Sequence, residues 1–184
     1  WKNKKVFITG HNGFKGSWLS IWLTELGAKV YGYSLKTNTE PSLFETCFLD
    51  ERVNSVTGDI RDYEKLKKTI TSVEPDIVIH MAAQALVLES YENPIETYQT
   101  NLMGTVNILN AIRELSSTKA LINVTSDKCY ENKENFKAFK ESDAMGGNDP
   151  YSSSKACSEL ITTGYRASFF KNSVAIATAR AGNV

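Results

Sequence analysis

Short runs of consecutive apolar residues recur along the chain, at positions 6–8, 77–79 and 174–177. A strand that is apolar at successive positions buries both faces, which is typical of a parallel sheet covered by helices on both sides. Segments with a helical pattern separate these runs almost throughout, and such alternation is typical of α/β folds. The sequence therefore predicts an open, doubly wound parallel sheet of the Rossmann type.

The pattern predicts six strands and four main helices within one domain. The expected strands are residues 5–9, 29–33, 52–56, 76–80, 120–125 and 173–178. The expected helices are residues 17–26, 63–73, 94–115 and 152–170. Gly27 is expected to end the first helix, Asp62 to cap the second, and Pro94 to lie in the first turn of the third. The polar segments 35–42 and 130–150 are expected to be surface loops.

Composition excludes several classes of protein. The 184 residues carry 21 Lys and Arg against 21 Asp and Glu, so no net charge attracts nucleic acid or an anionic membrane surface. No run is long and apolar enough to span a bilayer, and the first residues lack the apolar core of a signal peptide, so we expect a cytoplasmic protein. Three scattered cysteines argue against both a disulfide framework and a zinc site.

A glycine loop follows the first expected strand and opens the first helix. Its glycines are Gly10, Gly13 and Gly16. Glycines allow the backbone to approach a pyrophosphate closely, and a helix N-terminus offers free N–H groups and a partial positive charge. The loop therefore predicts a dinucleotide site that also includes His11, Phe14 and Lys15. His11 keeps two readings: a solvated loop side chain, or one that leans over the cofactor or the catalytic pocket.

The second and third strands end in residues that could bind the adenosine part of a dinucleotide. Ser34 can hydrogen-bond a ribose, whereas the nearby Lys36 could attract a 2′-phosphate. No acidic residue follows the second strand, so the choice between NAD and NADP stays open. No arginine lies there either, and its absence favours NAD. Asp59 and Ile60 follow the third strand, where a carboxylate and an aliphatic side chain could hold an adenine edge.

The fourth strand ends beside the place expected for the nicotinamide. Ala82 and Ala83 are small enough for a nicotinamide ribose to approach the backbone, and Gln84 follows them as a candidate for cofactor and substrate contacts. His80, before them, is expected to be a buried structural histidine. Asn101 lies in the next helix, where it either supports the catalytic loop by hydrogen bonding or is a buried structural residue.

Tyr151 and Lys155 stand four residues apart at the start of an amphipathic stretch. Four residues are about one helical turn, so both side chains leave the same face of a helix. Free tyrosine has a pKa near ~10, and a neighbouring cation lowers that pKa because it favours the phenolate. The pair therefore predicts a tyrosine that works as an acid and base.

Six motifs stand in the order found in the extended short-chain dehydrogenase/reductases. They are the glycine loop, GDIRD, HMAAQ, NLMGT, VTSDK and YSSSK. On these motifs the whole chain resembles that family. The resemblance implies that Tyr151 is the catalytic acid/base, that Lys155 binds the nicotinamide ribose and lowers the pKa of the tyrosine, and that Ser126 holds a substrate hydroxyl. Thr125, directly before it, is implied at the cofactor.

The sequence Ser126-Asp127-Lys128 resembles the Thr-Asp-Glu of the sugar-nucleotide 4,6-dehydratase branch, with Lys in place of Glu. That resemblance implies oxidation at C4 of the sugar, loss of water across C5 and C6, and return of the hydride to C6. Asp127 is then the candidate acid at the C6 hydroxyl. Lys128 is either the base at C5, which requires a lowered pKa, or an electrostatic stabiliser of the enolate while another group takes the proton.

The resemblance also implies partners for the chain. We expect residues 1–184 to form an NAD-binding domain, the N-terminal part of a longer enzyme, with the region that recognises the nucleotide of a nucleotide-sugar substrate absent. Candidate substrate contacts are Gln84, Ser126, Arg180 and Asn183, although Arg180 could instead be a structural ion-pair partner. Homo-oligomers are expected, with helices 94–115 and 152–170 packed as a four-helix bundle. No metal site, nucleic acid or membrane is expected.

Two rival functions remain from the sequence. The first is a sugar-nucleotide epimerase or reductase on the same scaffold, against which Asp127 argues. The second is a dinucleotide-binding sensor that has lost its chemistry, against which the presence of both Tyr151 and Lys155 argues.

Overall fold

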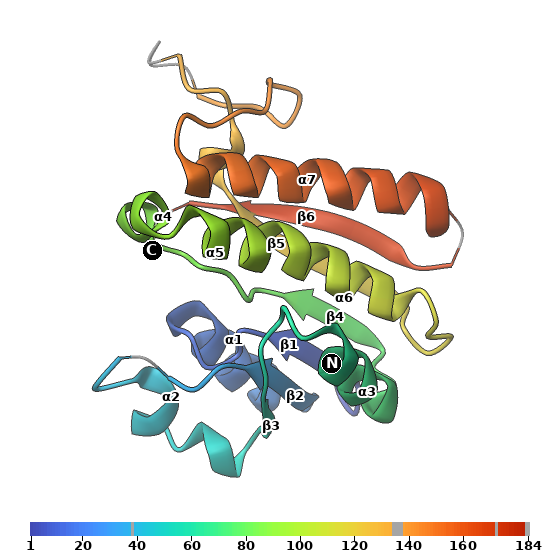
Figure 1. Ribbon diagram of the computed structural model, residues 1–184. Helices are drawn as coiled ribbons and strands as arrows, with labels where there is room; N and C mark the ends of the chain where they lie inside the picture. Colours follow the sequence, from blue (N-terminus) through green and yellow to red (C-terminus); the bar gives the residue numbers. More distant parts are fainter. Residues whose placement is uncertain (38, 134–137, 172, 183–184) are drawn as a thin grey trace.

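The computed structural model describes residues 1–37, 39–133, 138–171 and 173–182. Six parallel strands form one sheet in the order β3-β2-β1-β4-β5-β6 (Figure 1). The strands are β1 Lys5–Thr9, β2 Lys29–Ser34, β3 Asn54–Thr57, β4 Ile77–His80, β5 Ala120–Ser126 and β6 Ala175–Ala181. The predicted six-stranded, doubly wound sheet is confirmed, and every predicted strand overlaps an observed one.

Helices connect successive strands on both faces of this sheet. They are α1 Phe14–Glu25, α2 Leu43–Thr46, η1 Leu49–Glu51, α3 Tyr63–Val73, α4 Val87–Glu92, α5 Pro94–Tyr98, η2 Gln99–Met103, α6 Gly104–Ile112, η3 Asp127–Cys129 and α7 Pro150–Phe169. The predicted helix 94–115 is thus a rod of two α-helical parts joined by a π-helical turn, η2. The short helices α2 and α4 were not predicted. No helix in the described part of the chain is long and apolar enough to cross a membrane.

The capping predictions are confirmed. The Asp62 carboxylate accepts a hydrogen bond from the Lys65 backbone N–H at 3.0 Å and so caps α3. Gly27 follows α1 with a φ of +83°, a conformation that glycine adopts without steric cost. Pro94 lies in the first turn of α5, where the N–H that proline lacks would have no helical partner.

The core has two parts, one on each face of the sheet. Along β1, Phe7 packs with α3 and α6 on one face, whereas Val6 and Ile8 pack with α1 on the other. Burial of successive residues in this strand is what a continuously apolar run predicts. The same prediction is wrong for β6, where Ala175 and Ala177 are exposed. The reason is position, because β6 is an edge strand of the described sheet.

Candidate active site

The glycine loop is fixed by close backbone contacts at two of its glycines. A Cβ on Gly16 would lie 2.1 Å from the Gly10 carbonyl oxygen, and a Cβ on Gly10 would lie 2.8 Å from the Ala82 nitrogen. Gly10 also has a φ of +72°. A Cβ on Gly13, in contrast, would meet only the Gly10 oxygen, at 3.5 Å. Packing therefore requires glycine at positions 10 and 16, while Gly13 leaves open space at the start of α1.

The N-terminus of α1 fits an anionic group. Gly13 is the N-cap residue, no side chain of the described residues caps the helix, and no acidic residue lies in its first turn. The first N–H groups of an α-helix have no partner inside the helix and carry a partial positive charge. The open position at Gly13 lets a ligand reach these groups, so the loop has the donors and the space that a pyrophosphate requires.

His11 turns away from solvent into the core, so the solvated reading is wrong. Its ring lies against Gly32, where a Cβ would come within 2.2 Å of the imidazole, and meets the Phe44 ring edge-on with centroids 5.2 Å apart. Nε2 lies 2.7 Å from the Ser55 hydroxyl. Burial lowers the pKa of His11 to about 4, so the ring is neutral at pH 7.

The expected adenosine contacts lie at the ends of β2 and β3. Ser34 donates a hydrogen bond to the Asn12 side-chain oxygen at 2.6 Å, which ties the end of β2 to the glycine loop. Asp59 accepts hydrogen bonds from Arg61, and these bonds hold the pKa of the carboxyl below its ordinary value. Ile60 is buried. Beside them lies an open cavity of about 540 Å³, lined by Asp59, Arg61, Asp62, Gln99, Met103 and Asn107.

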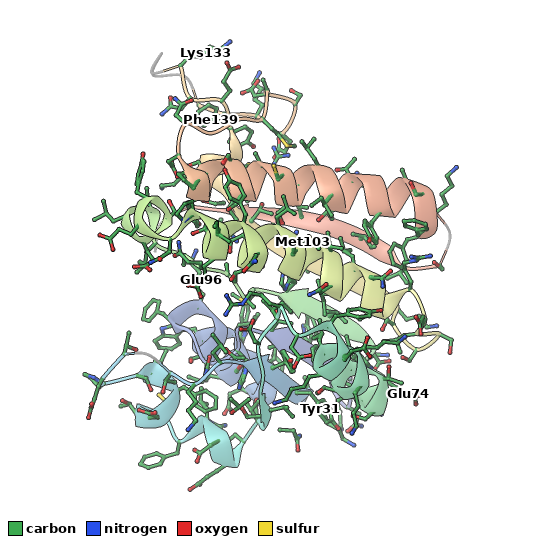
Figure 2. All side chains as sticks on the ribbon, viewed as in Figure 1. Tyr31, Glu74, Glu96, Met103, Lys133 and Phe139 are labelled. Atoms are coloured by element: carbon green, nitrogen blue, oxygen red, sulfur yellow. The ribbon has the colours of Figure 1, made fainter. Side chains whose placement is uncertain are left out.

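This cavity lies between two parts of the chain that are distant in sequence. Arg61 also pairs with Glu96 of α5 at 3.2 Å, so the segment after β3 is linked to the helical rod. Glu96 and Met103 are labelled on that rod in Figure 2.

Asn101 joins the end of β4 to α7. The buried amide of Asn101 accepts a hydrogen bond from the Gln84 N–H at 2.8 Å and donates to the Gln84 carbonyl at 3.0 Å. It also donates to the Ser154 hydroxyl at 2.9 Å, between the two residues of the Tyr-Lys pair. The buried structural reading of Asn101 is therefore confirmed, while its support of the catalytic loop stays a prediction, because these bonds reach Gln84 and Ser154.

The other predicted residues at the end of β4 are His80, Ala82, Ala83 and Gln84. His80 is buried and 2.7 Å from the Thr9 hydroxyl, and burial lowers its pKa to about 3, so its structural reading is confirmed. Ala82 and Ala83 remain partly exposed. The side-chain nitrogen of Gln84, Nε2, donates a hydrogen bond to the Leu86 backbone carbonyl at 3.0 Å.

Tyr151 and Lys155 lie in the first turns of α7 and are both buried. Burial lowers the pKa of Lys155 to about 8, with a smaller contribution from the positive charge of Lys15. Burial raises the pKa of Tyr151, although a hydrogen bond with Ser126 opposes the rise. In the described structure the pKa of Tyr151 is therefore raised and not lowered, because burial and the negative charges of Asp127 and Asp149 outweigh the hydrogen bond with Ser126. The effect of Lys155 on the tyrosine stays a prediction.

The second half of the site follows β5. The Ser126 hydroxyl donates to an Asp127 carboxylate oxygen at 3.1 Å and accepts from the Lys128 backbone N–H at 3.2 Å, which shapes the 3₁₀ turn η3. The Lys128 ammonium lies 3.7 Å from Asp127, and both side chains are partly exposed. Ser126 thus contacts Tyr151 and Asp127 together, and so joins the Tyr-Lys pair to the Asp-Lys pair. Thr125, directly before it, is buried and bonded to Glu159.

Arg180 of β6 pairs with a carboxylate of α7. It forms an ion pair with Glu159 at 3.1 Å, and Glu159 is almost fully buried. The ion-pair reading of Arg180 is therefore the one that the structure supports. Asn183 lies outside the described residues. Lys15 donates to the Gly182 carbonyl at 3.2 Å, which brings the glycine loop next to the end of β6, and Phe14 is exposed.

Sequence reasoning missed two carboxylates that build the site. Asp149 caps α7 by accepting from the Ser152 N–H at 2.8 Å, and Asp before Pro at a helix start is a signal that could have found it. Glu159 stands four residues after Lys155, so helical spacing places it on the same face as the Tyr-Lys pair.

Comparison with known proteins places these features in a family. The family model described as GDP-mannose 4,6 dehydratase matches residues 7–179. The chain is 54% identical to CDP-glucose 4,6-dehydratase of Salmonella typhimurium, covering 100% of this chain and 53% of that protein. It is 32% identical to GDP-mannose 4,6-dehydratase of Vibrio cholerae, covering 91% of this chain and 47% of that one.

The fold is likewise similar to that of a solved enzyme. UDP-glucose 4-epimerase from Brucella ovis, in complex with NAD, superposes with a TM-score of 0.83 at 26% identity. The match covers 98% of this chain and 52% of the epimerase. The chain spans about half the length of the relatives that it matches.

Proposed function

Because the chain belongs to the GDP-mannose 4,6-dehydratase family, we propose that it carries the cofactor half and the reacting half of an NAD-dependent sugar-nucleotide 4,6-dehydratase. The proposed substrate is CDP-glucose, and the proposed products are CDP-4-dehydro-6-deoxyglucose and water. One observation carries the proposal: Ser126 hydrogen-bonds the Asp127 carboxylate at 3.1 Å and also acts on the pKa of the Tyr151 phenol, so the Tyr-Lys pair and the Asp-Lys pair meet at one place.

The proposed cofactor fits the residues at the carboxyl ends of the strands. The N-terminus of α1 would hold the pyrophosphate, Ser34, Asp59 and Ile60 the adenosine, and Ala82, Ala83 and Lys155 the nicotinamide ribose. When bound, NAD supplies an acceptor for the C4 hydride and later a donor of the same hydride.

The side chains handle the protons of the first step. Tyr151 takes the proton of the C4 hydroxyl, while Ser126 orients that oxygen by hydrogen bonding. Lys155 is mostly protonated below pH 8, so its charge stabilises the phenolate that forms when the proton is transferred. Oxidation at C4 makes the hydrogen on C5 acidic, because the new carbonyl stabilises negative charge on C5.

Elimination then needs a base at C5 and an acid at the C6 hydroxyl. Asp127 is the proposed acid, since its carboxyl lies next to Ser126. Lys128 is the proposed base or the cation that stabilises the enolate. The C5 proton is removed and the C6–O bond breaks, with the oxygen leaving as water. The hydride taken from C4 is then added at C6, and a proton is returned to C5. The reaction consumes no external reductant.

The test is product analysis with the full-length protein. CDP-glucose, dTDP-glucose, UDP-glucose and GDP-mannose are incubated separately, and a 4-keto-6-deoxy product is expected from CDP-glucose. Tyr151→Phe, which keeps the ring and removes the proton acceptor, is the matched control and should form no product. A 4-epimer of any of the four sugars as sole product would contradict the proposal.

Assembly and location are further parts of the proposal. We propose that the longer protein is a cytoplasmic homo-oligomer that pairs through α5, α6 and α7. In support, three apolar side chains along this surface are exposed: Ile95 of α5, Met103 of η2 and Leu160 of α7. Light scattering of the full-length protein tests this directly, and Leu160→Glu should shift the mass toward that of the monomer.

A further inference from the structure

The buried carboxylate of Glu159 hydrogen-bonds residues of two neighbouring strands, β5 and β6. Glu159 of α7 is 2% exposed and accepts hydrogen bonds from three donors. Thr125, the residue before Ser126 in β5, donates to one oxygen, and Thr178 of β6 donates to the other at 2.9 Å. Arg180 donates to that second oxygen at 3.1 Å. The carboxylate of Glu159 thereby fixes the ends of β5 and β6 to the helix that carries Tyr151.

Arg180 extends this hydrogen-bond network to residues that follow the η3 turn. Its second amino group donates to the Tyr130 hydroxyl at 2.8 Å and to the Glu141 carbonyl at 3.1 Å. The guanidinium also lies over the Tyr130 ring, 4.8 Å from the centroid. The Tyr130 ring stacks on Phe139, labelled in Figure 2, with centroids 4.6 Å apart. Arg180 therefore anchors Tyr130, directly after η3, and Glu141, which precedes α7.

Thr125 and Tyr130 lie on either side of Asp127 and Lys128 in the sequence. Thr125 directly precedes Ser126, and Tyr130 directly follows the η3 turn, which contains Asp127 and Lys128. One buried ion pair thus holds both ends of the segment that carries the acid and the candidate base. Tyr151 and Lys155 have separate support, because they lie in the first turns of a 20-residue helix.

We propose that Glu159 and Arg180 are positioning residues for elimination, which hold Asp127 and Lys128 in place relative to the sugar that Tyr151 oxidises. The inference rests on the proposed function. Neither residue touches the reacting atoms, so the pair acts through Thr125 and Tyr130. Small displacements of reacting groups cost large factors in rate, which is why such an anchor affects chemistry.

Electrostatics explain why the pair stays charged. Burial by itself raises the pKa of Glu159, yet the hydrogen bonds from Arg180, Thr125 and Thr178 lower it overall. The hydrogen bond to Glu159 raises the pKa of Arg180. Removing one partner leaves a buried charge without compensation, whereas removing both does not. This difference separates the effect of the pair on stability from its effect on positioning.

The test follows oxidation and elimination separately in the full-length protein. Single-turnover NADH absorbance reports C4 oxidation, and the 4-keto-6-deoxy product reports elimination. In Glu159→Gln we expect product formation to fall about 10- to 100-fold and NADH formation to stay within about threefold, since one charge-assisted contact is lost. Thr178→Val, which removes one donor and no charge, should show the same split with a smaller fall. Glu114→Gln, which breaks the exposed Lys67–Glu114 pair, is the matched control and should change neither rate.

The double variant Glu159→Gln/Arg180→Met decides between positioning and stability. We expect it to recover thermal stability relative to Glu159→Gln, because no buried charge is left unpaired, while elimination stays slow. Recovery of elimination together with stability would overturn the inference, and so would an equal fall of both partial reactions in Thr178→Val. Failure of the proposed function itself is distinct, because the unmodified protein would then form no 4-keto-6-deoxy product.

Discussion

Two glycines in helices provide a matched pair of substitutions with opposite expected effects. In most exposed helix interiors, replacing Gly by Ala stabilises by up to about 1 kcal/mol, because Ala has the higher helix propensity. Gly164 of α7 meets this condition, since a Cβ there would find no atom of the described residues within 4 Å. We therefore expect Gly164→Ala to raise the free energy of unfolding by up to about 1 kcal/mol.

Gly16 of α1 is the opposite case. A Cβ there would lie 2.1 Å from the Gly10 carbonyl oxygen and 2.8 Å from the His11 Cα, both backbone atoms that cannot rotate away. Relief requires α1 to move by about 1 Å relative to the loop, an overpacking that costs about 1–3 kcal/mol. We expect Gly16→Ala to lower the free energy of unfolding by this amount and to weaken NAD binding at least about tenfold, because the loop and helix N-terminus no longer align.

The assay is denaturant unfolding of the two full-length variants beside the unmodified protein, together with NAD titration by calorimetry. Gly164→Ala controls for the general effect of alanine in a helix and should leave NAD affinity unchanged. If Gly16→Ala were as stable as Gly164→Ala and bound NAD normally, the role assigned to the glycine loop would be refuted.

Three further predictions concern the site. Asn101→Leu should lower the free energy of unfolding by about 2–4 kcal/mol and lower activity more than NAD affinity, since the buried amide loses three hydrogen bonds. Calorimetry and steady-state kinetics check this, and equal losses of activity and NAD affinity would contradict it. Lys128→Met should abolish entry of solvent deuterium at C5 if Lys128 is the base, and unchanged exchange measured by NMR would reject that role. Because the pKa of Lys155 is lowered to about 8, the folded state loses this proton at a lower pH than the unfolded state does. Burial of the charged lysine therefore lowers the free energy of unfolding most below pH 8, and this effect disappears by about pH 10.5. Lys155→Met should therefore be more stable than the unmodified protein at pH 7, by at most about 3 kcal/mol at ~1.4 kcal/mol per pH unit. Denaturant unfolding at pH 7 and at pH 10.5 checks this. An equal stability difference between the two proteins at both pH values would contradict it.

The sheet could be predicted because its central strands are apolar at successive positions, and only burial on both faces explains such runs. The same reasoning failed at β6, where alanine satisfies the pattern but is exposed. Whether a strand lies at an edge depends on strand order, which apolar runs do not encode. The short helix α4 was missed because six residues are too few to establish a periodicity and no side chain caps its start among the described residues.

For the site, the sequence identifies residue types in a motif but not the direction of each side chain. His11, in the glycine loop, turns into the core because Gly32 of β2 leaves room for its ring. Arg180 turns inward because it pairs with Glu159 of α7. These two residues are 21 positions apart in the sequence, so a local motif does not indicate the pairing. The pKa of Tyr151 depends on burial by surrounding elements, which the spacing of Tyr151 and Lys155 does not include.

The most direct measurement follows the hydride within one molecule. The full-length protein is incubated with CDP-glucose that carries deuterium at C4, and the product is examined by NMR and mass spectrometry. The account predicts a 4-keto-6-deoxy product with the deuterium at C6 and no net formation of NADH. Deuterium retained at C4 of a C4 epimer would contradict it, because the hydride would then have returned to the carbon from which it came.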